Sequence, residues 1–368
     1  MARLELRSLS RSFGSVVAVS QLSLQAPDGA LLCLLGPSGS GKTTTMRLIA
    51  GLEIPDSGSI WMGERDITSL EPKDRHVGMM FQGYALYPHL SVGDNIAYPL
   101  RVRGTPRSER DQRVLEVARM LEIDPLLGRS VRQISGGQAQ RVALARAIVQ
   151  RPDLYLLDEP ISNLDAALRS TMRGVIKRLQ RMLGTTSIVV THDQLDALAM
   201  ADLVAVMDQG SLQQLGTPDE VYDRPANTFV ARFMGDPQMN LIQGQVERSD
   251  QLLGVRIVGH WVSIEAPAAR AVEAFGGSTV MVGIRPKGVR ILRQSVPESI
   301  PAKVYVVAPE GSRVIYDLLV DDHLFKVEAE TTLNLSLDEE VYLEFRSENL
   351  HLFAAESANG VIEGGRIA

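Results

Sequence analysis

One eight-residue stretch constrains the fold of this chain more than any other. Gly36-Pro37-Ser38-Gly39-Ser40-Gly41-Lys42-Thr43 fits the pattern G-x-x-x-x-G-K-[S/T] at every fixed position. The apolar run at residues 30–35 predicts a buried strand before it, and residues 44–50 predict the start of a helix after it. A strand, a glycine-rich loop and a helix in this order are typical of a phosphate-binding loop, because backbone N–H groups and the positive helix end face the anion.

The same stretch predicts which side chains meet the phosphates of a nucleotide. Lys42 supplies a mobile positive charge for the β- and γ-phosphates, and the hydroxyl of Thr43 can be a ligand of Mg²⁺. The alternative is a turn rich in glycine and serine that binds nothing. The predicted strand and helix on its two sides favour the phosphate loop.

The composition is that of an ordinary globular protein. The chain has 368 residues, of which 45% are apolar and 22% charged, and this length is enough for two domains. No stretch approaches the roughly 18 apolar residues of a membrane-spanning helix. The one cysteine, Cys33, cannot form an internal disulfide, so we expect a small buried thiol in a cytosolic protein.

Charge is distributed unevenly along the chain. Residues 1–235 carry 26 basic and 25 acidic residues, whereas residues 236–368 carry 12 and 19. This difference predicts a change of domain near residue 236, and it gives no basic domain of the kind that binds nucleic acid. Residues 101–151 hold 11 arginines and five acidic residues. This stretch is either a solvated helical face or an electropositive surface near a nucleotide.

The order of elements predicts a parallel sheet with helices on its faces. Apolar strands alternate with helices over residues 154–207, and a helical insert is expected at about 84–150 between two strands of the sheet. Four polar positions lie just past predicted strand ends: Gly36, Gln82, Asp158 and His192. We expect these four to converge on one crevice, because ligands bind at the carboxyl ends of such strands.

The rest of the chain predicts a different kind of domain. Thr217 to Glu220 reads as a capping box that opens a short helix. From about residue 241 short strands alternate with turns, which predicts a small all-β barrel or sandwich. The tail from Ser357 is polar and rich in glycine, so we expect it to be disordered. The predicted strands are 242–247, 251–257, 280–284, 302–308, 312–319, 323–329 and 340–345.

Two further segments carry chemistry. Asp158 ends a buried strand, where a carboxylate can hold Mg²⁺ through water, and Glu159 beside it can polarise an attacking water. Ser135-Gly136-Gly137-Gln138 opens a predicted helix with exposed N–H groups. Each segment has a plain structural alternative when taken alone: acids at the end of a strand, and a capped helix start.

Taken together with the phosphate loop, these segments resemble the ATP-binding-cassette (ABC) ATPases. That family has a phosphate loop, a Q-loop, an S-G-G-Q segment, a D-E pair and a single histidine in this order. The matching positions are Gly36–Thr43, Gln82, Ser135–Gln138, Asp158-Glu159, Ser162-Asn163-Leu164-Asp165 and His192. The resemblance extends over residues 1–235.

Other segments resemble the maltose-type carbohydrate-importer ATPases, which carry a C-terminal regulatory domain of OB-like β modules. These segments are Tyr84–His89, Tyr222–Pro225, Gly235–Asn240 and Gly283–Pro286. The resemblance thus implies a P-loop cassette at residues 1–235 and an OB-like domain at 236–368. Four positions depart from the family pattern: Ile134, Ala139, Ile161 and Lys287.

The resemblance also implies roles for single residues. Glu159, His192, Gln82 and Lys42 would be catalytic, and Thr43, Gln82 and Asp158 would hold Mg²⁺. Phe13 would stack on the adenine of ATP, its alternative being a buried core side chain. The other ATP-binding positions of the same subunit would be Gly36, Pro37, Ser38, Gly39, Ser40, Gly41, Lys42, Thr43 and Thr44. A second subunit would contribute Ser135, Gly136, Gly137, Gln138 and Asp165 to the same ATP.

The implied partners follow from the family. We expect a homodimer on the cytoplasmic face of the cell membrane, bound to two transmembrane permease subunits and served by an extracytoplasmic solute-binding protein. Tyr84–His89 would face the permease, and ATP hydrolysis would power import of a carbohydrate or polyol. An ABC ATPase of translation or DNA repair would usually show two cassettes or a long coiled coil. A non-catalytic subunit would have lost Glu159, Lys42 or His192, and all three are present.

Overall fold

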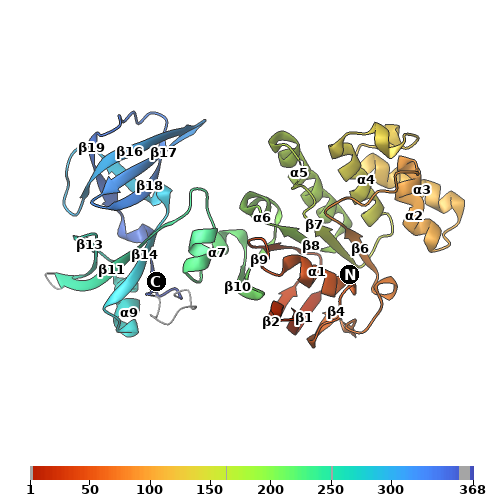
Figure 1. Ribbon diagram of the computed structural model, residues 1–368, viewed down its shortest axis with the longest axis horizontal. Helices are drawn as coiled ribbons and strands as arrows, with labels where there is room; N and C mark the ends of the chain where they lie inside the picture. Colours follow the sequence, from red (N-terminus) through yellow and green to blue (C-terminus); the bar gives the residue numbers. More distant parts are fainter. Residues whose placement is uncertain (1–2, 163, 250–251, 356–364) are drawn as a thin grey trace. The chain divides into compact units, whose positions relative to one another are not determined.

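The computed structural model describes residues 3–162, 164–249, 252–355 and 365–368. The chain divides into two compact units, Met1–Glu220 and Val221–Ala368 (Figure 1). Asn163, part of one predicted segment, lies outside the described residues. The domain boundary after residue 235 and the extent of the helical subdomain stay predictions.

A six-stranded sheet forms the centre of the first unit, in the order β10-β9-β3-β8-β7-β6. Five neighbouring strands run parallel, and β10 is added antiparallel at one edge. All residues of β3, β7 and β8 are buried, as expected for strands covered on both faces. The strands are β3 (Leu31–Leu35), β6 (Val77–Met80), β7 (Leu154–Asp158), β8 (Thr186–Thr191), β9 (Leu203–Asp208) and β10 (Ser211–Gly216).

An antiparallel layer covers one face of this sheet, with helix α1 (Lys42–Ala50) between them. Met46, Leu48 and Ile49 of α1 belong to one hydrophobic cluster with side chains from both sheets. This packing fixes α1, and therefore the loop that precedes it. The layer has the order β2-β1-β4-β5, made of β1 (Leu4–Phe13), β2 (Val16–Ala26), β4 (Ser57–Met62) and β5 (Arg65–Asp66).

Helices lie on the other face of the central sheet. Leu144 of α4 (Gly136–Ile148) and Leu179 of α5 (Ala166–Leu183) contact a hollow that Tyr155 and Leu157 of β7 also line. Helix α6 (Gln194–Met200) follows β8 and contacts α5. Because α1 lies on the opposite face, the sheet has helices on both faces as predicted.

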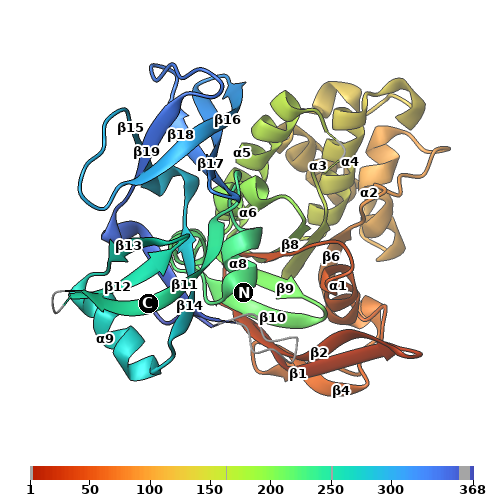
Figure 2. The same ribbon diagram turned by 60° about the vertical axis from the view of Figure 1, so that its left-hand side comes forward.

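The predicted helical insert lies between β6 and β7. It consists of α2 (Val92–Val102), α3 (Arg107–Met120) and α4. In both views this group stands apart from the antiparallel layer of the same unit (Figure 1, Figure 2). The helical periodicity of the sequence predicts helices at residues 108–121 and 138–150, which agree with α3 and α4 within two residues at each end, but it misses α2.

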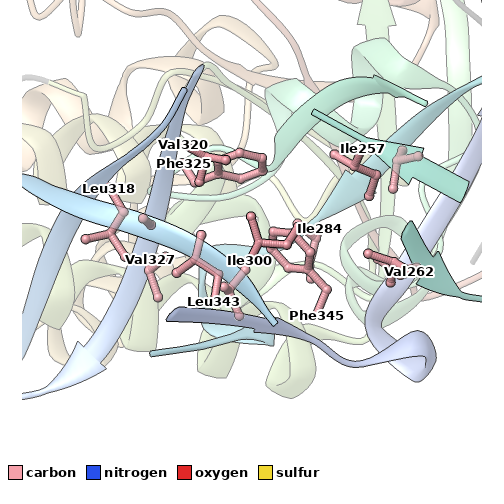
Figure 3. Packing of buried hydrophobic residues seen from close by; sticks show 14 of the residues in the cluster. Ile257, Val262, Ile284, Ile300, Leu318, Val320, Phe325, Val327, Leu343 and Phe345 are labelled. Carbon is pink, nitrogen blue, oxygen red and sulfur yellow. The ribbon is translucent and has the colours of Figure 1, made fainter. Parts of the chain in front are cut away.

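The second unit contains two five-stranded antiparallel sheets. One has the order β13-β12-β11-β14-β20: β11 (Asn240–Ser249), β12 (Leu252–Ile257), β13 (His260–Ser263), β14 (Thr279–Ile284) and β20 (Leu350–Ala354). The other has the order β15-β19-β16-β17-β18: β15 (Val289–Leu292), β16 (Ile300–Glu310), β17 (Arg313–Val320), β18 (His323–Glu330) and β19 (Glu340–Phe345). Figure 3 shows Ile257 and Ile284 from the first sheet close to Phe325 and Phe345 from the second, in one hydrophobic cluster.

This β-rich unit also contains helices that the strand pattern did not predict. They are α8 (Thr228–Phe233) and α9 (Ala266–Phe275). A further short helix, α7 (Pro218–Asp223), was predicted and runs across the division between the units. The predicted capping box before α7 is confirmed, because Thr217 N donates to Glu220 Oε2 at 2.8 Å and Glu220 N donates to Thr217 Oγ1 at 3.3 Å. Single 3-10 turns occur at Pro72–Asp74, Asp124–Leu126, Val131–Gln133, Pro286–Gly288 and Ser347–Asn349.

The expectation of a disordered tail was wrong for its last four residues. Backbone hydrogen bonds join Ala368 to Leu352 in both directions, at 2.8 and 3.1 Å. Ile367 and Ala368 pack against the core of the second unit. Backbone hydrogen bonds to β20 order the last four residues, and such bonds cannot be predicted from the polarity of the side chains. Residues 356–364 lie outside the described residues.

Candidate nucleotide-binding and hydrolysis site

The ends of four parallel strands converge on one region of the first unit. The phosphate loop follows β3, Gln82 follows β6, Glu159 follows β7 and His192 follows β8. A cavity of about 680 Å³ lies there, lined by residues 37–44 of the loop together with Gln82, Glu159 and His192. Of the four positions predicted to meet there, Gln82 and His192 line this cavity, whereas Gly36 and Asp158 are not among the described residues that line it, and Glu159 does so beside Asp158. The side chains that the sequence separates by up to 155 positions therefore surround a single space.

The loop is shaped by its glycines and by its own lysine. Gly39 and Gly41 have φ angles of 81° and 97°, and a Cβ on Gly41 would lie 2.3 Å from the carbonyl oxygen of Ala18. Nζ of Lys42 donates to the carbonyls of Gly36 at 2.8 Å and Pro37 at 2.7 Å. Burial lowers the pKa of Lys42, and the nearby carboxylates of Glu159 and Asp158 oppose this. The ammonium is thus held where an anion in the loop would meet it.

Glu159 is held from two sides. Nε2 of Gln82 donates to Oε2 at 2.7 Å, and Nδ1 of His192 lies 2.9 Å from Oε1. The side chain of Glu159 is only 18% exposed, and its backbone has φ 45°, a conformation uncommon in residues other than glycine. Such strain persists where the surroundings enforce it, often at functional sites. The carboxylate is therefore fixed in orientation at the edge of the cavity.

Asp158 differs from its neighbour because it is buried and only 6% exposed. Burial raises the pKa of Asp158, the charge of Glu159 raises it further, and a hydrogen bond with Thr43 lowers it. Among the described residues, Oδ1 of Asp158 has no hydrogen-bond partner. A buried carboxylate oxygen beside a threonine hydroxyl, with no partner of its own, fits a Mg²⁺ ion held directly and through water.

The rim of the cavity includes residues that the sequence did not predict. Val16, Val17 and Ala18 of β2 line it, and Val16 and Val17 are 64% and 54% exposed. Phe13 is 45% exposed, which excludes the buried-core alternative, and it lies under the guanidinium of Arg11 at 4.7 Å. It pairs with Val16 across the turn from β1 to β2 but is not among the described residues that line the cavity. The sequence did contain a signal for this part of the rim, because two valines, Val16 and Val17, directly follow the turn after Phe13.

The S-G-G-Q segment opens α4. Oγ of Ser135 accepts from the backbone N of Gln138 at 3.3 Å, and Oε1 of Gln138 accepts from the backbone N of Ser135 at 3.0 Å. Gly136 is open, because an added Cβ would meet nothing within 4 Å, whereas a Cβ on Gly137 would lie 2.3 Å from Leu168. Within the described part of the chain, no residue of this segment lines the phosphate-loop cavity. One chain therefore does not bring the two predicted parts of the site together.

Asp165 caps the next helix. Its Oδ1 accepts from the backbone N of Leu168 at 2.9 Å at the start of α5. Arg169 donates from Nη1 to Asp193 Oδ2 at 2.9 Å and from Nη2 to the carbonyl of Ser162 at 2.9 Å. These contacts tie the segment before α5 to the residue that follows His192.

Five of the eleven arginines in the arginine-rich stretch form ion pairs with acidic side chains. The pairs are Arg101–Asp94, Arg107–Asp111, Arg113–Glu109, Arg141–Glu122 and Arg151–Glu116. Exposed pairs of this kind neutralise charge locally and contribute little stability. This favours the solvated face over an electropositive surface.

Comparison with known proteins identifies the family. Residues 19–162 match the family model described as ABC transporter, and residues 235–287 match the model described as MalK OB fold domain. The trehalose/maltose import ATP-binding protein MalK of Thermococcus litoralis is 45% identical over 367 residues, covering 96% of this chain and 98% of that protein. This chain belongs to the ATP-binding proteins of the ABC transporter family.

Other members of the family are similar over comparable lengths. The sn-glycerol-3-phosphate import ATP-binding protein UgpC of Chromobacterium violaceum is 42% identical over 368 residues, covering 97% of this chain and 95% of that protein. Among solved structures, a dimeric ATP-binding cassette in a post-hydrolysis state bound to ADP and Pi covers 58% of this chain and 98% of its own, with 28% identity and a TM-score of 0.53. The predicted family, the cassette fold and the OB-like second domain are therefore confirmed. No helix in the described ranges is long and apolar enough to cross a membrane.

Proposed function

We infer that this family member hydrolyses ATP, as its Mg²⁺ complex, to energise import of a small solute through separate permease subunits. The observation that carries this proposal is the Glu159 carboxylate, held by Gln82 and His192 at the edge of the phosphate-loop cavity. Phosphoryl transfer requires chiefly a positioned water and neutralised phosphate charge. The cavity offers both kinds of group in one place.

Each residue has a distinct part in the proposed reaction. Glu159 accepts a hydrogen bond from the attacking water and orients it toward the γ-phosphate. Gln82 and His192 keep that carboxylate in place, and His192, which lines the same cavity, would also meet the γ-phosphate. Lys42 and the backbone N–H groups of residues 38–44 neutralise charge that spreads over the phosphate oxygens. Thr43, Asp158 and Gln82 would hold Mg²⁺, which would supply further neutralisation of phosphate charge.

We place the second half of the site on another copy of the chain. The helix start at Ser135 has N–H groups and an open Gly136, which suit a phosphate, yet none of it lines the cavity of its own chain among the described residues. In a homodimer, Ser135–Gln138 and Asp165 of one subunit would face ATP held by the loop of the other. Phe13, which is exposed and pairs with Val16 of the cavity rim, would stack on the adenine.

The wider assignment follows the relatives. Those named above import trehalose or maltose in one case and sn-glycerol-3-phosphate in the other. We propose a solute of the carbohydrate or polyol class, two permease subunits, an extracytoplasmic solute-binding protein, and a peripheral position on the cytoplasmic face of the membrane. We also keep residues 1–235 as the nucleotide-binding domain, with a helical subdomain at about 84–150, and residues 236–368 as the OB-like domain.

Replacing Glu159 by glutamine tests the reaction. The amide keeps the size of the side chain but cannot act as a base, so Glu159→Gln should lower phosphate release at least about 100-fold while ATP affinity is retained. Phosphate release and equilibrium binding of a fluorescent ATP analogue would be measured on the full chain assembled with its permease. The exposed Glu64→Gln variant is the matched control. Normal phosphate release by Glu159→Gln would overturn the role given to Glu159.

A further inference from the structure

Arg146 of α4 makes contacts that the proposed chemistry does not use. Its Nη2 donates to the carbonyl of Tyr84 at 2.6 Å and its Nη1 donates to the carbonyl of Ala85 at 2.7 Å. Its guanidinium also lies 5.5 Å from the ring centroid of Tyr87. One side chain therefore holds three residues of the loop that follows Gln82.

The part of the loop that Arg146 holds is strained. Tyr84 and Ala85 have φ angles of 58° and 47°, in the left-handed region that side chains other than glycine rarely adopt. A residue in this conformation persists only when its surroundings enforce it. The fork of Arg146 satisfies both carbonyls of this turn at once, which lysine, with a single ammonium, cannot do in the same geometry.

The helix that carries Arg146 begins at the S-G-G-Q segment. Arg146 lies ten positions after Gly136, which corresponds to about 15 Å along the helix. The end of α4 packs closely on β6, because a Cβ on Gly78 would lie 2.6 Å from the carbonyl oxygen of Ala147. Strand β6 leads directly to Gln82. Both ends of the Gln82 segment, the strand before it and the turn after it, therefore rest on α4.

Since Gln82 in turn holds Glu159, the contacts form one chain across the unit. We propose that Arg146 is a positioning residue: by fixing the turn at Tyr84 and Ala85 to α4, it sets the position of Gln82 against Glu159. This inference rests on the proposed function of Glu159. Through these contacts, α4 and the hydrolysis site move together. A phosphate of a second subunit that binds at Ser135 would therefore change the position of Gln82.

A double-mutant cycle on the full chain tests this route. Arg146→Lys keeps the charge but loses the fork, so kcat for phosphate release should fall at least about tenfold, the lower end of the value of one hydrogen bond to a charged group. KM for ATP should change by less than about twofold, because Arg146 does not touch the nucleotide loop. In a Gln82→Ala background the same substitution should lower kcat less than about 1.5-fold, because its route is already broken.

The control and the second readout separate this inference from the proposed function. Arg151→Lys, on an exposed arginine paired with Glu116, should leave kcat unchanged. Hydrogen exchange of the peptide spanning residues 83–89 should be faster in Arg146→Lys than in the parent chain, whether or not the chain hydrolyses ATP. An equal loss of kcat in both backgrounds, or unchanged exchange of that peptide, would overturn the role of Arg146. A parent chain that releases no phosphate while exchange accelerates would instead contradict the proposed function.

Discussion

At the residue scale, two adjacent carboxylates differ because their surroundings differ. Glu159 has a hydrogen-bonding partner on each oxygen, whereas Asp158 is buried with one oxygen unpartnered among the described residues. The first arrangement fixes a base in orientation. The second leaves a buried carboxylate oxygen without a hydrogen-bond partner, which is expected of an oxygen that binds a cation.

Asp158 should therefore destabilise the chain when no cation is bound. Its pKa is raised by burial above the value of an unfolded aspartate, so the folded state binds more protons and this residue's contribution falls as pH rises. Asp158→Asn removes the buried charge and should raise the free energy of unfolding by about 1 kcal/mol at neutral pH without Mg²⁺. Urea unfolding followed by circular dichroism measures this change.

The same substitution should abolish hydrolysis. Phosphate release with Mg²⁺ present should be lost in Asp158→Asn although the apoprotein is more stable. A variant that is less stable than the parent without Mg²⁺, or that hydrolyses ATP normally, would contradict this account of Asp158.

Which site residues could be predicted depends on how local their signal is. Lys42 and Thr43 belong to one continuous pattern, and Asp158 and His192 end apolar runs, so sequence alone indicates a common crevice. Arg146 gave no such signal, because its partner Tyr84 lies 62 positions away and accepts through a backbone carbonyl. Any residue type at position 84 offers that carbonyl, so the contact is invisible in the sequence.

At the element scale, two helix starts offer a natural comparison. Ser135 caps α4 and Ser130 caps the 3-10 turn before it, each with a reciprocal bond from a glutamine three residues later. Ser135→Ala and Ser130→Ala should each lower the free energy of unfolding by about 1 kcal/mol, the usual value of an N-cap. Urea unfolding of both variants measures this.

Only the Ser135 variant should also affect catalysis. If Ser135 meets the phosphate of a second subunit, Ser135→Ala lowers phosphate release roughly tenfold, the value of one hydrogen bond to a charged group. Ser130→Ala should release phosphate at the parent rate. Equal phosphate release by the two alanine variants would mean that Ser135 is a helix cap and nothing more.

The elements that the sequence missed have different physical causes. Helix α2 contains Pro99, a residue that disfavours a helix interior, although its buried Val92, Ile96 and Leu100 recur every fourth position. Edge strand β10 is only half-buried. Helix α9 lies between β13 and β14, in the gap between the predicted strands at 251–257 and 280–284. Strands β13, β15 and β20 have four or five residues and form because neighbours pair with them. Buried parallel strands and long amphipathic helices, which carry their own signal, were predicted.

At the scale of the whole molecule, the second unit should respond to pH through His351. Burial lowers the pKa of His351 to about 4, and the charges of Arg366 and Arg285 add to this. An unfolded histidine has a pKa near 6.5, so the folded state binds fewer protons between these values. The stability contribution is complete above pH 6.5 and is lost as pH falls, by about 2 kcal/mol at pH 5.

This loss can be measured on the full chain. The sequence has two tryptophans, so in a Trp61→Phe background Trp261 reports on the second unit alone. Urea unfolding followed by its fluorescence at pH 7 and pH 5 should show the loss, and His351→Gln should remove most of it. The exposed His323→Gln variant is the control. A pH dependence that survives in His351→Gln would contradict the assignment.

The central claim is that one hydrolysis site needs two copies of the chain, and mixing two inactive variants tests it most directly. Lys42→Ala damages the phosphate loop and Ser135→Arg blocks the opposite helix start, so each should be inactive alone. In a mixed dimer, one site combines both defects and the other combines the intact loop with the intact helix start.

Phosphate release by the two variants alone and mixed in equal amounts, in the assembled transporter, is therefore the deciding measurement. The account predicts that the mixture recovers about a quarter of the parent rate, because half of the dimers hold one intact site of two. A mixture as inactive as its two components would contradict it, since each chain would then hold a complete site of its own.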